Sequence, residues 1–242
     1  MIKQREKLSL FNGDCLEVMQ EIPQKSIDLI LCDLPYGTTA CKWDSIIPFG
    51  LLWEQYDRVI KDNGAVVLFA AQPFTTKLIQ SNLKDFRYCW YWKKNNVTGG
   101  QFAKVQPMRC IEDICVFYRK KPTYNPQGIV KIINPVKREM NNQSNVYKWR
   151  GKEMYIQQYT NYPKHLICFA KDKTNLHPTQ KPVALLEYLV KTYTNEGDTV
   201  LDNCMGSGST GEACLNTNRR FIGIEKEHKY FNIAKNRLER CG

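Results

Sequence analysis

Short, continuous apolar runs alternate with longer amphipathic segments toward both ends of this 242-residue chain, and no other feature limits its possible folds as strongly. Runs of this kind suit strands that are buried on both faces of a sheet. The predicted strands are residues 8–11, 27–33, 65–70, 87–92, 113–118, 165–170, 199–202 and 221–225. The predicted helices are residues 15–22, 49–62, 73–83, 182–194, 209–217 and 228–239. The alternation therefore predicts an α/β fold with a doubly wound, mainly parallel sheet.

The middle of the chain breaks this pattern. Residues 121–163 are rich in Asn, Gln, Pro, Tyr and Lys, and their hydrophobic periodicity is weak. We expect an insertion or small lobe there, mobile until something charged binds it. The predicted organisation is one domain in two parts, residues 1–120 and 165–242, interrupted by an insertion at 121–164.

The excess positive charge is concentrated in the same region. The chain has 35 Lys and Arg against 24 Asp and Glu, a net charge of +11. Residues 119–164 hold ten basic and two acidic residues and so contribute +8, which leaves +3 for all the rest. A basic patch of this kind is typical of a surface that binds a polyanion.

Two other features bear on location and chemistry. The N-terminal stretch has no apolar core of a signal peptide, and no run is long enough to span a bilayer, so we expect a cytoplasmic protein. Ten cysteines include no C-x-x-C pair, and several lie within apolar strand-like runs. Free, mostly buried thiols are expected, and no metal site is predicted.

A glycine-rich turn follows the predicted strand at 199–202. The strand ends in Asp202, and Gly206, Gly208 and Gly211 then match G-x-G-x-x-G before a helix. Glu225 ends the next strand, where a dinucleotide-binding unit carries its ribose-binding acid. A structural tight turn and an NAD site are alternatives, whereas the spacing of a phosphate-binding P-loop is absent. Because Asp202 would repel a pyrophosphate but suits an ammonium group, S-adenosylmethionine fits better than NAD.

Four ordered motifs carry a resemblance to a known family. DLPYG at 33–37, HPTQKP at 177–182, LDNCMGSGSTG at 201–211 and FIGIE at 221–225 are similar to motifs of the amino-group (N6-adenine/N4-cytosine) DNA methyltransferases. Their order, with a variable region between, resembles the beta class. The similarity covers nearly the whole chain except about 125–162. It implies a Rossmann-like methyltransferase fold, S-adenosylmethionine as cofactor and double-stranded DNA as substrate.

The resemblance also implies a set of cofactor-binding residues. In it Asp202 and the Gly206–Gly208 turn would meet the methionine end, Glu225 the ribose hydroxyls and Asp14 the adenine amine. The full set is Asp14, Cys15, Thr179, Lys181, Asp202, Asn203, Gly206, Gly208 and Glu225. The sequence departs from the family at Asn203–Cys204, where Pro-Phe is usual, and this puts the packing there in doubt. A solvated charge at a helix start is the alternative interpretation of Lys181.

The catalytic residues implied by DLPYG are Asp33, Leu34, Pro35 and Tyr36. An exocyclic adenine amine is a poor nucleophile because its lone pair is delocalised into the ring. The Asp33 carboxylate and the Leu34 carbonyl would each accept a hydrogen bond from one N–H group of this amine. Pro35 would fix the direction of the Leu34 carbonyl. Tyr36 would stack on the extruded base. Leu34 replaces a usual proline, and Asp33 favours adenine, since cytosine-N4 enzymes more often carry Ser there.

Basic and aromatic residues interleave in the middle region, where they can contact phosphates and bases. The predicted DNA-binding residues are Lys120, Lys121, Lys137, Arg138, Lys148, Arg150 and Lys152. A solvated basic loop is the alternative interpretation.

Together these features predict a site-specific, base-flipping DNA adenine-N6 methyltransferase. The alternatives are cytosine-N4 methylation, adenine methylation in RNA, a catalytically decayed nucleic-acid-binding protein on the same fold, and an NAD enzyme. Many members of the class form homodimers, so a homodimer is one expectation. Any restriction endonuclease of a restriction-modification system would be a separate chain.

Overall fold

The computed structural model describes residues 7–38, 41, 44–141, 152–172 and 180–241. The chain folds into two units. The main unit comprises Met1–Asn125 and His165–Gly242, and the insert unit comprises Pro126–Lys164.

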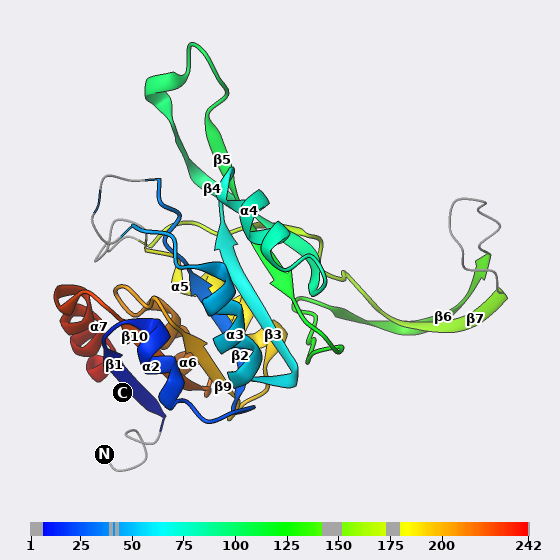
Figure 1. Cartoon of the computed structure of the whole chain (residues 1–242). Helices are drawn as coiled ribbons and strands as arrows, with labels where there is room; N and C mark the ends of the chain where they lie inside the picture. The colour runs from blue at the N-terminus through cyan, green and yellow to red at the C-terminus, as the bar shows by residue number, and fades with distance from the viewer. Residues whose placement is uncertain (1–6, 39–40, 42–43, 142–151, 173–179, 242) are drawn as a thin grey trace. The chain divides into compact units, whose positions relative to one another are not determined.

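A mainly parallel sheet forms the centre of the main unit (Figure 1). Its order within the described residues is β1-β10-β9-β2-β3-β5-β4-β8. The pairs from β1 to β3 are parallel, β5 runs antiparallel to both β3 and β4, and β8 is parallel to β4. The strands are β1 Leu8–Asn12, β2 Ile27–Asp33, β3 Ile60–Ala70, β4 Phe86–Thr98, β5 Arg109–Phe117, β8 Leu166–Cys168, β9 Thr199–Asp202 and β10 Arg220–Glu225. The predicted mainly parallel sheet is confirmed.

Helices cover both faces of this sheet. Successive side chains of a strand point to opposite faces, so an apolar strand presents side chains for burial on both. Along β2, Leu29 and Leu31 pack in one core cluster with the helices α5, α6 and α7, whereas Ile30 and Cys32 pack in the other with α2, α3 and α4. The helices are α2 Cys15–Val18, α3 Phe49–Val59, α4 Phe74–Ser81, α5 Val183–Tyr193, α6 Ser209–Asn216 and α7 His228–Arg240. Short 3₁₀ turns lie at Met19–Glu21 and Gly100–Phe102. This two-sided cover is what a doubly wound fold requires.

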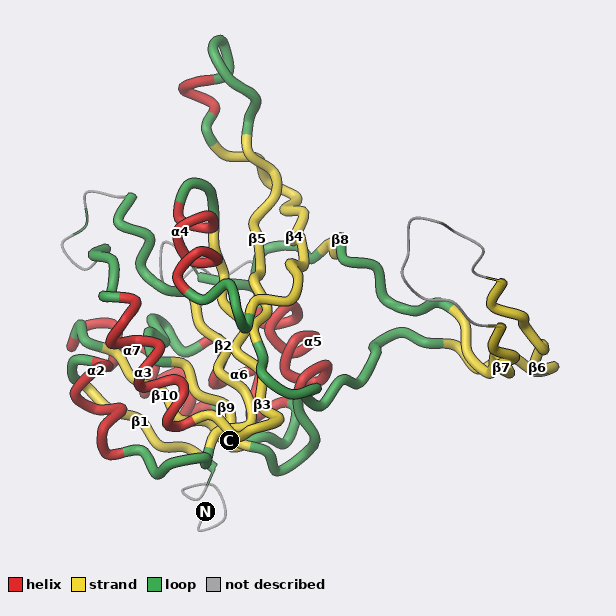
Figure 2. The backbone as a smooth tube through the Cα atoms, turned by 45° about the vertical axis from the view of Figure 1, so that its right-hand side comes forward, coloured by secondary structure: helices red, strands yellow, loops and turns green. Residues whose placement is uncertain are grey.

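Several boundaries in the main unit differ from the sequence prediction. α3 ends at Val59, and β3 begins at Ile60 rather than at residue 65, because Ile60 pairs with Ile27 of β2. β4 continues past its predicted end at residue 92, and β5 begins before its predicted start at residue 113. The two strands pair as a long hairpin that projects beyond the rest of the sheet (Figure 2).

The insert unit contains two strands that the sequence did not predict. β6 (Val130–Asn141) and β7 (Lys152–Thr160) pair as an antiparallel ribbon. Apolar side chains of this ribbon face solvent, as shown by Ile133, which is 95% exposed. These strands are therefore defined by backbone pairing and do not bury one face. Without a buried face, the sequence has no alternation of apolar and polar residues from which to predict them.

The described residues include no helix that is long and apolar enough to cross a membrane. All ten cysteines are free, but only Cys15, Cys32, Cys115 and Cys214 are buried, so the prediction of mostly buried thiols is wrong. Cys32 lies in the core below the β2 end, and burial raises the pKa of its thiol to about 12.

Candidate functional site

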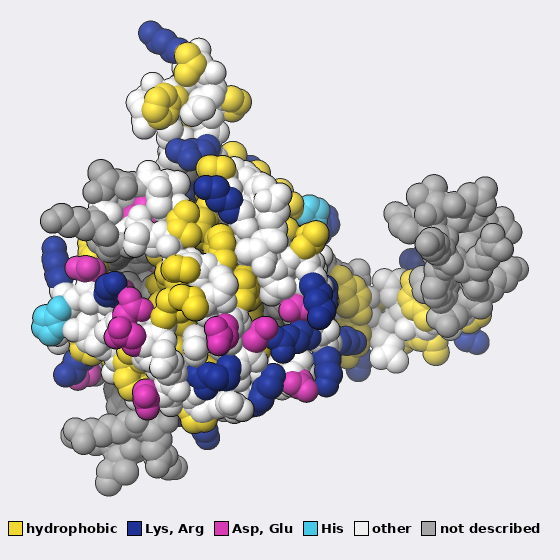
Figure 3. Space-filling view, viewed as in Figure 1, with side chains coloured by type: hydrophobic (Ala, Val, Ile, Leu, Met, Phe, Trp, Pro, Cys, Tyr) yellow, Lys and Arg dark blue, Asp and Glu magenta, His cyan; other side chains and the backbone are white. Residues whose placement is uncertain are grey.

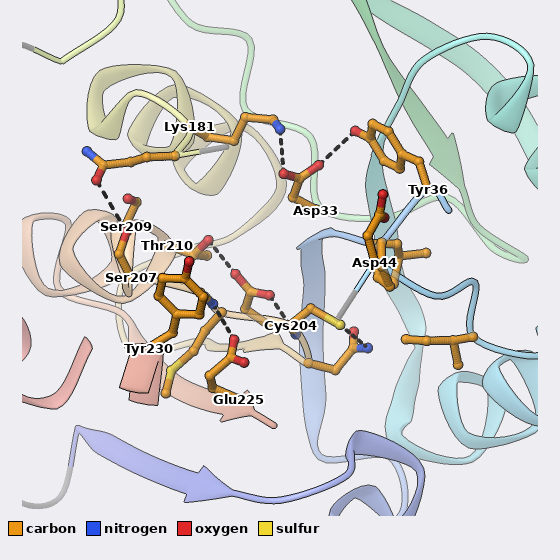
Figure 4. Close-up of a pocket in the computed structure, with 18 of the residues that line it drawn as sticks. Asp33, Tyr36, Asp44, Lys181, Cys204, Ser207, Ser209, Thr210, Glu225 and Tyr230 are labelled. Atoms are coloured by element: carbon orange, nitrogen blue, oxygen red, sulfur yellow. Dashed lines mark hydrogen bonds and ion pairs between the residues drawn. The ribbon is translucent and has the colours of Figure 1, made fainter. Parts of the chain in front are cut away.

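Three carboxylates lie at the same edge of the sheet. Asp33, Asp202 and Glu225 end the neighbouring parallel strands β2, β9 and β10. Carboxyl ends of parallel strands meet at one edge, which is where open α/β sheets bind ligands. A cavity of about 690 Å³ opens there, and all three residues line it. Figure 4 shows Asp33 and Glu225 among the residues of its wall.

Asp33 is held between two donors. The Tyr36 hydroxyl donates to Asp33 Oδ1 at 2.7 Å, and the Lys181 ammonium donates to Asp33 Oδ2 at 2.5 Å (Figure 4). The Tyr36 ring stacks on Phe74 of α4, with ring centroids 4.9 Å apart. Burial raises the pKa of Asp33, and the adjacent Lys181 ammonium opposes that shift. This end of the cavity thus presents a carboxylate and an aromatic ring that are both fixed in place.

Lys181 is a buried cation and not a solvated one. Its side chain is only 9% exposed, and it also pairs with Glu112 Oε1 at 2.9 Å. Burial acts to lower the pKa of Lys181, but Asp33 and Glu112 outweigh it and raise the pKa above its usual range. The alternative interpretation of Lys181 as a solvated helix-start charge is therefore wrong.

Glu112 of β5 is a residue of this cluster that sequence reasoning missed. It accepts from Lys181, from Lys94 at 2.6 Å and from the Tyr36 hydroxyl at 3.3 Å. Desolvation acts to raise the pKa of Glu112, but the two ammonium groups lower it to about 2. No motif surrounds Glu112, and its partners are distant in the chain, so only the folded sheet reveals the contact.

Asp44 is a second residue that no motif marks. Its carboxylate accepts from the backbone N–H groups of Gly37 and Thr38, each at 2.9 Å. These bonds hold the segment that directly follows Tyr36. Leu34, before Pro35, has a buried side chain, which anchors the same turn in the core.

The glycine turn is organised by two buried carboxylates. Asp202 accepts from the Thr210 hydroxyl at 2.6 Å and from Cys204 N at 3.1 Å. Glu225 accepts from Gly206 N at 2.9 Å, and burial raises the pKa values of both acids, to about 6 for Asp202. Gly206 and Gly208 have φ angles of 53° and 80°, a left-handed conformation that side chains disfavour. The turn thus needs its glycines and leads directly into α6.

The residues at the Pro-Phe departure pack through polar contacts. The Tyr56 hydroxyl of α3 donates to Asn203 Oδ1 at 2.6 Å, and Asn203 Nδ2 contacts Cys204 Sγ at 3.6 Å. Asn203 and Cys204 both line the cavity.

Asp14 and Cys15 lie at the start of α2, on the cavity wall. Asp14 caps the helix by accepting from Leu16 N at 3.0 Å, and its other oxygen pairs with Lys226 at 3.0 Å. The structure therefore brings Asp14, Cys15, Lys181, Asp202, Asn203, Gly206 and Glu225 to one cavity, with Gly208 in the adjoining turn. Thr179 is outside the described residues.

The predicted DNA-binding residues are divided between the units. Lys120 pairs with Asp62 at 2.9 Å on the surface of the main unit, and Lys121 is exposed there. Lys137 and Arg138 lie on β6 with exposed side chains, and Arg138 donates to Gln157 at 3.0 Å. Lys152 begins β7, and Lys148 and Arg150 lie outside the described residues.

This chain is similar in sequence to known DNA methyltransferases. The type II methyltransferase M.HpaI of Haemophilus parainfluenzae is 29% identical, over 95% of this chain and 74% of that protein. The DNA adenine methyltransferase YhdJ of Escherichia coli (strain K12) is 28% identical, over 97% of this chain and 83% of that protein.

Solved structures give the same picture. The M1.HpyAVI–SAM complex superposes with a TM-score of 0.65 at 26% identity, covering 96% of this chain and 98% of that one. The cytosine-N4-specific PvuII DNA methyltransferase superposes with a TM-score of 0.71, covering 96% of this chain and 86% of that one, but at 15% identity it supports the fold alone. The family profile described as DNA methylase matches residues 27–236, which include the Asp33, Lys181, Asp202 and Glu225 positions. This chain therefore belongs to the N6/N4 DNA methylase family.

Proposed function

We propose that this protein transfers a methyl group from S-adenosylmethionine to the N6 amine of an adenine that has been extruded from double-stranded DNA. The observation that carries the proposal is that the Asp33–Tyr36 turn lines the same cavity as the glycine turn and its two carboxylates, Asp202 and Glu225. One turn suits a target amine and the other a nucleoside cofactor, so the two reactants would meet without water between them.

The residues around the glycine turn fit the proposed cofactor. Asp202, Glu225 and Asp14 provide carboxylates suited to an ammonium group, a ribose diol and an adenine amine, and they would disfavour a pyrophosphate. Left-handed Gly206 and Gly208 give the ligand access to the backbone before α6. When bound, S-adenosylmethionine supplies an electrophilic sulfonium methyl group. This fit favours it over NAD.

The Asp33 carboxylate and the Leu34 carbonyl would accept hydrogen bonds from the two N–H groups of the target amine. These bonds would direct the lone pair of the amine toward the cofactor side of the cavity. Tyr36 would stack on the extruded base, and its own contact with Phe74 keeps the ring in position. Each Asp33 oxygen already accepts one donor, and Glu112 is a second acceptor for both the Tyr36 hydroxyl and the Lys181 ammonium. Glu112 can therefore take these donors when the amine binds Asp33.

The charges of this cluster balance. Asp33 and Glu112 are paired with Lys181 and Lys94, so the four groups sum to zero. Positive charge develops on the target nitrogen during methyl transfer, and a preorganised negative group stabilises such a charge. Glu112 would offset Lys181 and leave the Asp33 carboxylate free to act on the target.

Adenine is favoured over cytosine because the turn begins with Asp33, and the relative YhdJ is named as an adenine enzyme. Mass spectrometry of nucleosides from unmethylated DNA, incubated with the protein and S-adenosylmethionine, tests this proposal. N6-methyladenine supports it. N4-methylcytosine would retain the chemistry but refute the base assignment, and the absence of both would refute DNA methylation, provided that cofactor binding is shown separately.

A further inference from the structure

The projecting end of the β4–β5 hairpin carries side chains to which the proposed function assigns no role. It comprises residues 97–109 and is closed by Gly99, which has a φ angle of 88°, and by the 3₁₀ turn Gly100–Phe102. Val105 N and Gln106 N donate to the Phe102 carbonyl at 2.9 and 3.0 Å. The hairpin end is thus an ordered element with its own backbone hydrogen bonds.

Apolar side chains at this hairpin end face solvent. Phe102 is 46% exposed, Val105 81% and Met108 41%. Figure 3 shows hydrophobic and basic side chains together where the hairpin projects from the main unit. Single exposed apolar side chains are common on protein surfaces, but several gathered at one projecting tip indicate a contact surface.

The charge of the hairpin identifies the kind of partner. Between Lys93 and Ile111 the charged residues are Lys93, Lys94, Lys104 and Arg109, with no Asp or Glu. A cationic element of this kind suits a polyanion.

The hairpin also continues from the wall of the cavity. Thr98, Arg109 and Ile111 line the cavity together with Asp33 and Tyr36. A duplex that delivers a base to Asp33 would therefore lie against the hairpin. Apolar side chains such as Phe and Met can enter a base stack and fill space between bases.

We propose that the end of the β4–β5 hairpin contacts double-stranded DNA beside the extruded base, with Phe102, Val105 and Met108 at the opened base stack and Lys104 and Arg109 at the phosphates. This inference rests on the proposed function and adds a DNA surface in the main unit, separate from the insert unit. Its contribution to methylation is greatest when the target base must be removed from a complete pair.

The test compares a Phe102→Ala/Met108→Ala variant with wild type on two unmethylated duplexes. Both duplexes contain the sequence that the wild-type protein methylates. One duplex is fully paired, and the other has an abasic site opposite the target, which lowers the cost of extrusion. We expect the variant to lose about tenfold or more in methylation rate on the paired duplex and less than about threefold on the other. Leu83→Ala, at an apolar side chain of the main unit that is 68% exposed, is the matched control and should retain its rate on both.

Equal losses on the two duplexes, or no loss on either, would overturn the inference. Wild-type rates report on the proposed function itself, and only the ratio of variant to wild type reports on the hairpin. Cofactor affinity equal to wild type shows that the variant is folded. Sedimentation of both proteins tests the other occupant: a dimer that the variant loses, with its methylation unchanged, would assign the surface to a second copy and refute DNA contact.

The phosphate contacts are tested through the salt dependence of duplex binding. Lys104→Gln/Arg109→Gln should reduce the slope of log affinity against log salt by about 2, since each phosphate contact contributes about one. Lys235→Gln, at an exposed position of α7, is the control. An unchanged slope in the double variant would contradict these contacts, whether or not the protein methylates DNA.

Discussion

Replacing Glu112 by Gln should slow methyl transfer by leaving Lys181 uncompensated. The substitution keeps the size of the side chain and an acceptor for the Tyr36 hydroxyl, but it changes the cluster of Asp33, Glu112, Lys181 and Lys94 from neutral to +1. The added charge would lie beside the nitrogen on which positive charge develops. The expected defect is therefore in the chemical step and not in binding.

The magnitude follows from the distances. Lys181 Nζ is 2.5 Å from Asp33 Oδ2 and 2.9 Å from Glu112 Oε1, so these carboxylate oxygens lie within about 5.4 Å of each other. A target amine hydrogen-bonded to Asp33 would be within roughly 8 Å of Glu112. At an effective dielectric constant of about 20, one full charge at that distance contributes about 2 kcal/mol. Because only part of a charge develops, we expect a decrease of about 5- to 30-fold.

Single-turnover methylation with saturating cofactor and DNA measures the effect, and calorimetric titration measures cofactor affinity. The sharper observation is rescue: Glu112→Gln/Lys181→Met restores neutrality and should be faster than Glu112→Gln alone, when both are compared above the acid limb of the rate profile. Asp113→Asn, which changes the next residue of β5 where it accepts from Thr75, is the control. A double variant slower than the single variant would refute the charge-balance explanation and leave Glu112 with a packing role.

Other predictions concern the remaining parts of the site. Lys181→Met should move the acid limb of the transfer rate to higher pH. Burial raises the pKa of Asp33 and the Lys181 ammonium lowers it, so in the variant the Asp33 carboxylate forms only at higher pH. A pH–rate profile that does not shift would contradict this. Gly208→Ala should destabilise the protein by about 1–3 kcal/mol in chemical unfolding, because φ is 80° and the new Cβ would lie 3.1 Å from Ala234, whereas Gly50→Ala, with open space around it, should not destabilise it. Replacing Lys148, Arg150 and Lys152 by Ala should weaken DNA binding and flatten its salt dependence, and unchanged affinity at low salt would argue against a DNA-binding role for these residues.

The parallel half of the site could be predicted because its geometry follows from local sequence. Asp33, Asp202 and Glu225 each end an apolar run, and parallel strands bring such ends to one edge. The Gly206–Gly208 turn was visible for the same reason, since glycine marks a backbone conformation that other residues avoid.

The missed parts depend on contacts between distant segments. Glu112 enters the cluster because β5 is antiparallel between β3 and β4, and Lys181 is buried because two carboxylates meet it there. Neither fact has a periodic or motif signal. The β6–β7 ribbon was missed for a different reason: its strands pair without burying an apolar face, as exposed Ile133 and Met154 show.

The rate at which an Asp33→Ala variant transfers a labelled methyl group from S-adenosylmethionine to target DNA, measured beside its cofactor affinity, tests the assignment of the reaction to this carboxylate. Asp33 lies in the turn proposed to hold the target amine, while the cofactor residues are proposed to lie at β9, β10 and α2. The expected result is cofactor affinity close to wild type with N6-methyladenine formation abolished. Retained turnover would show that another group accepts the target amine and would contradict the proposed mechanism.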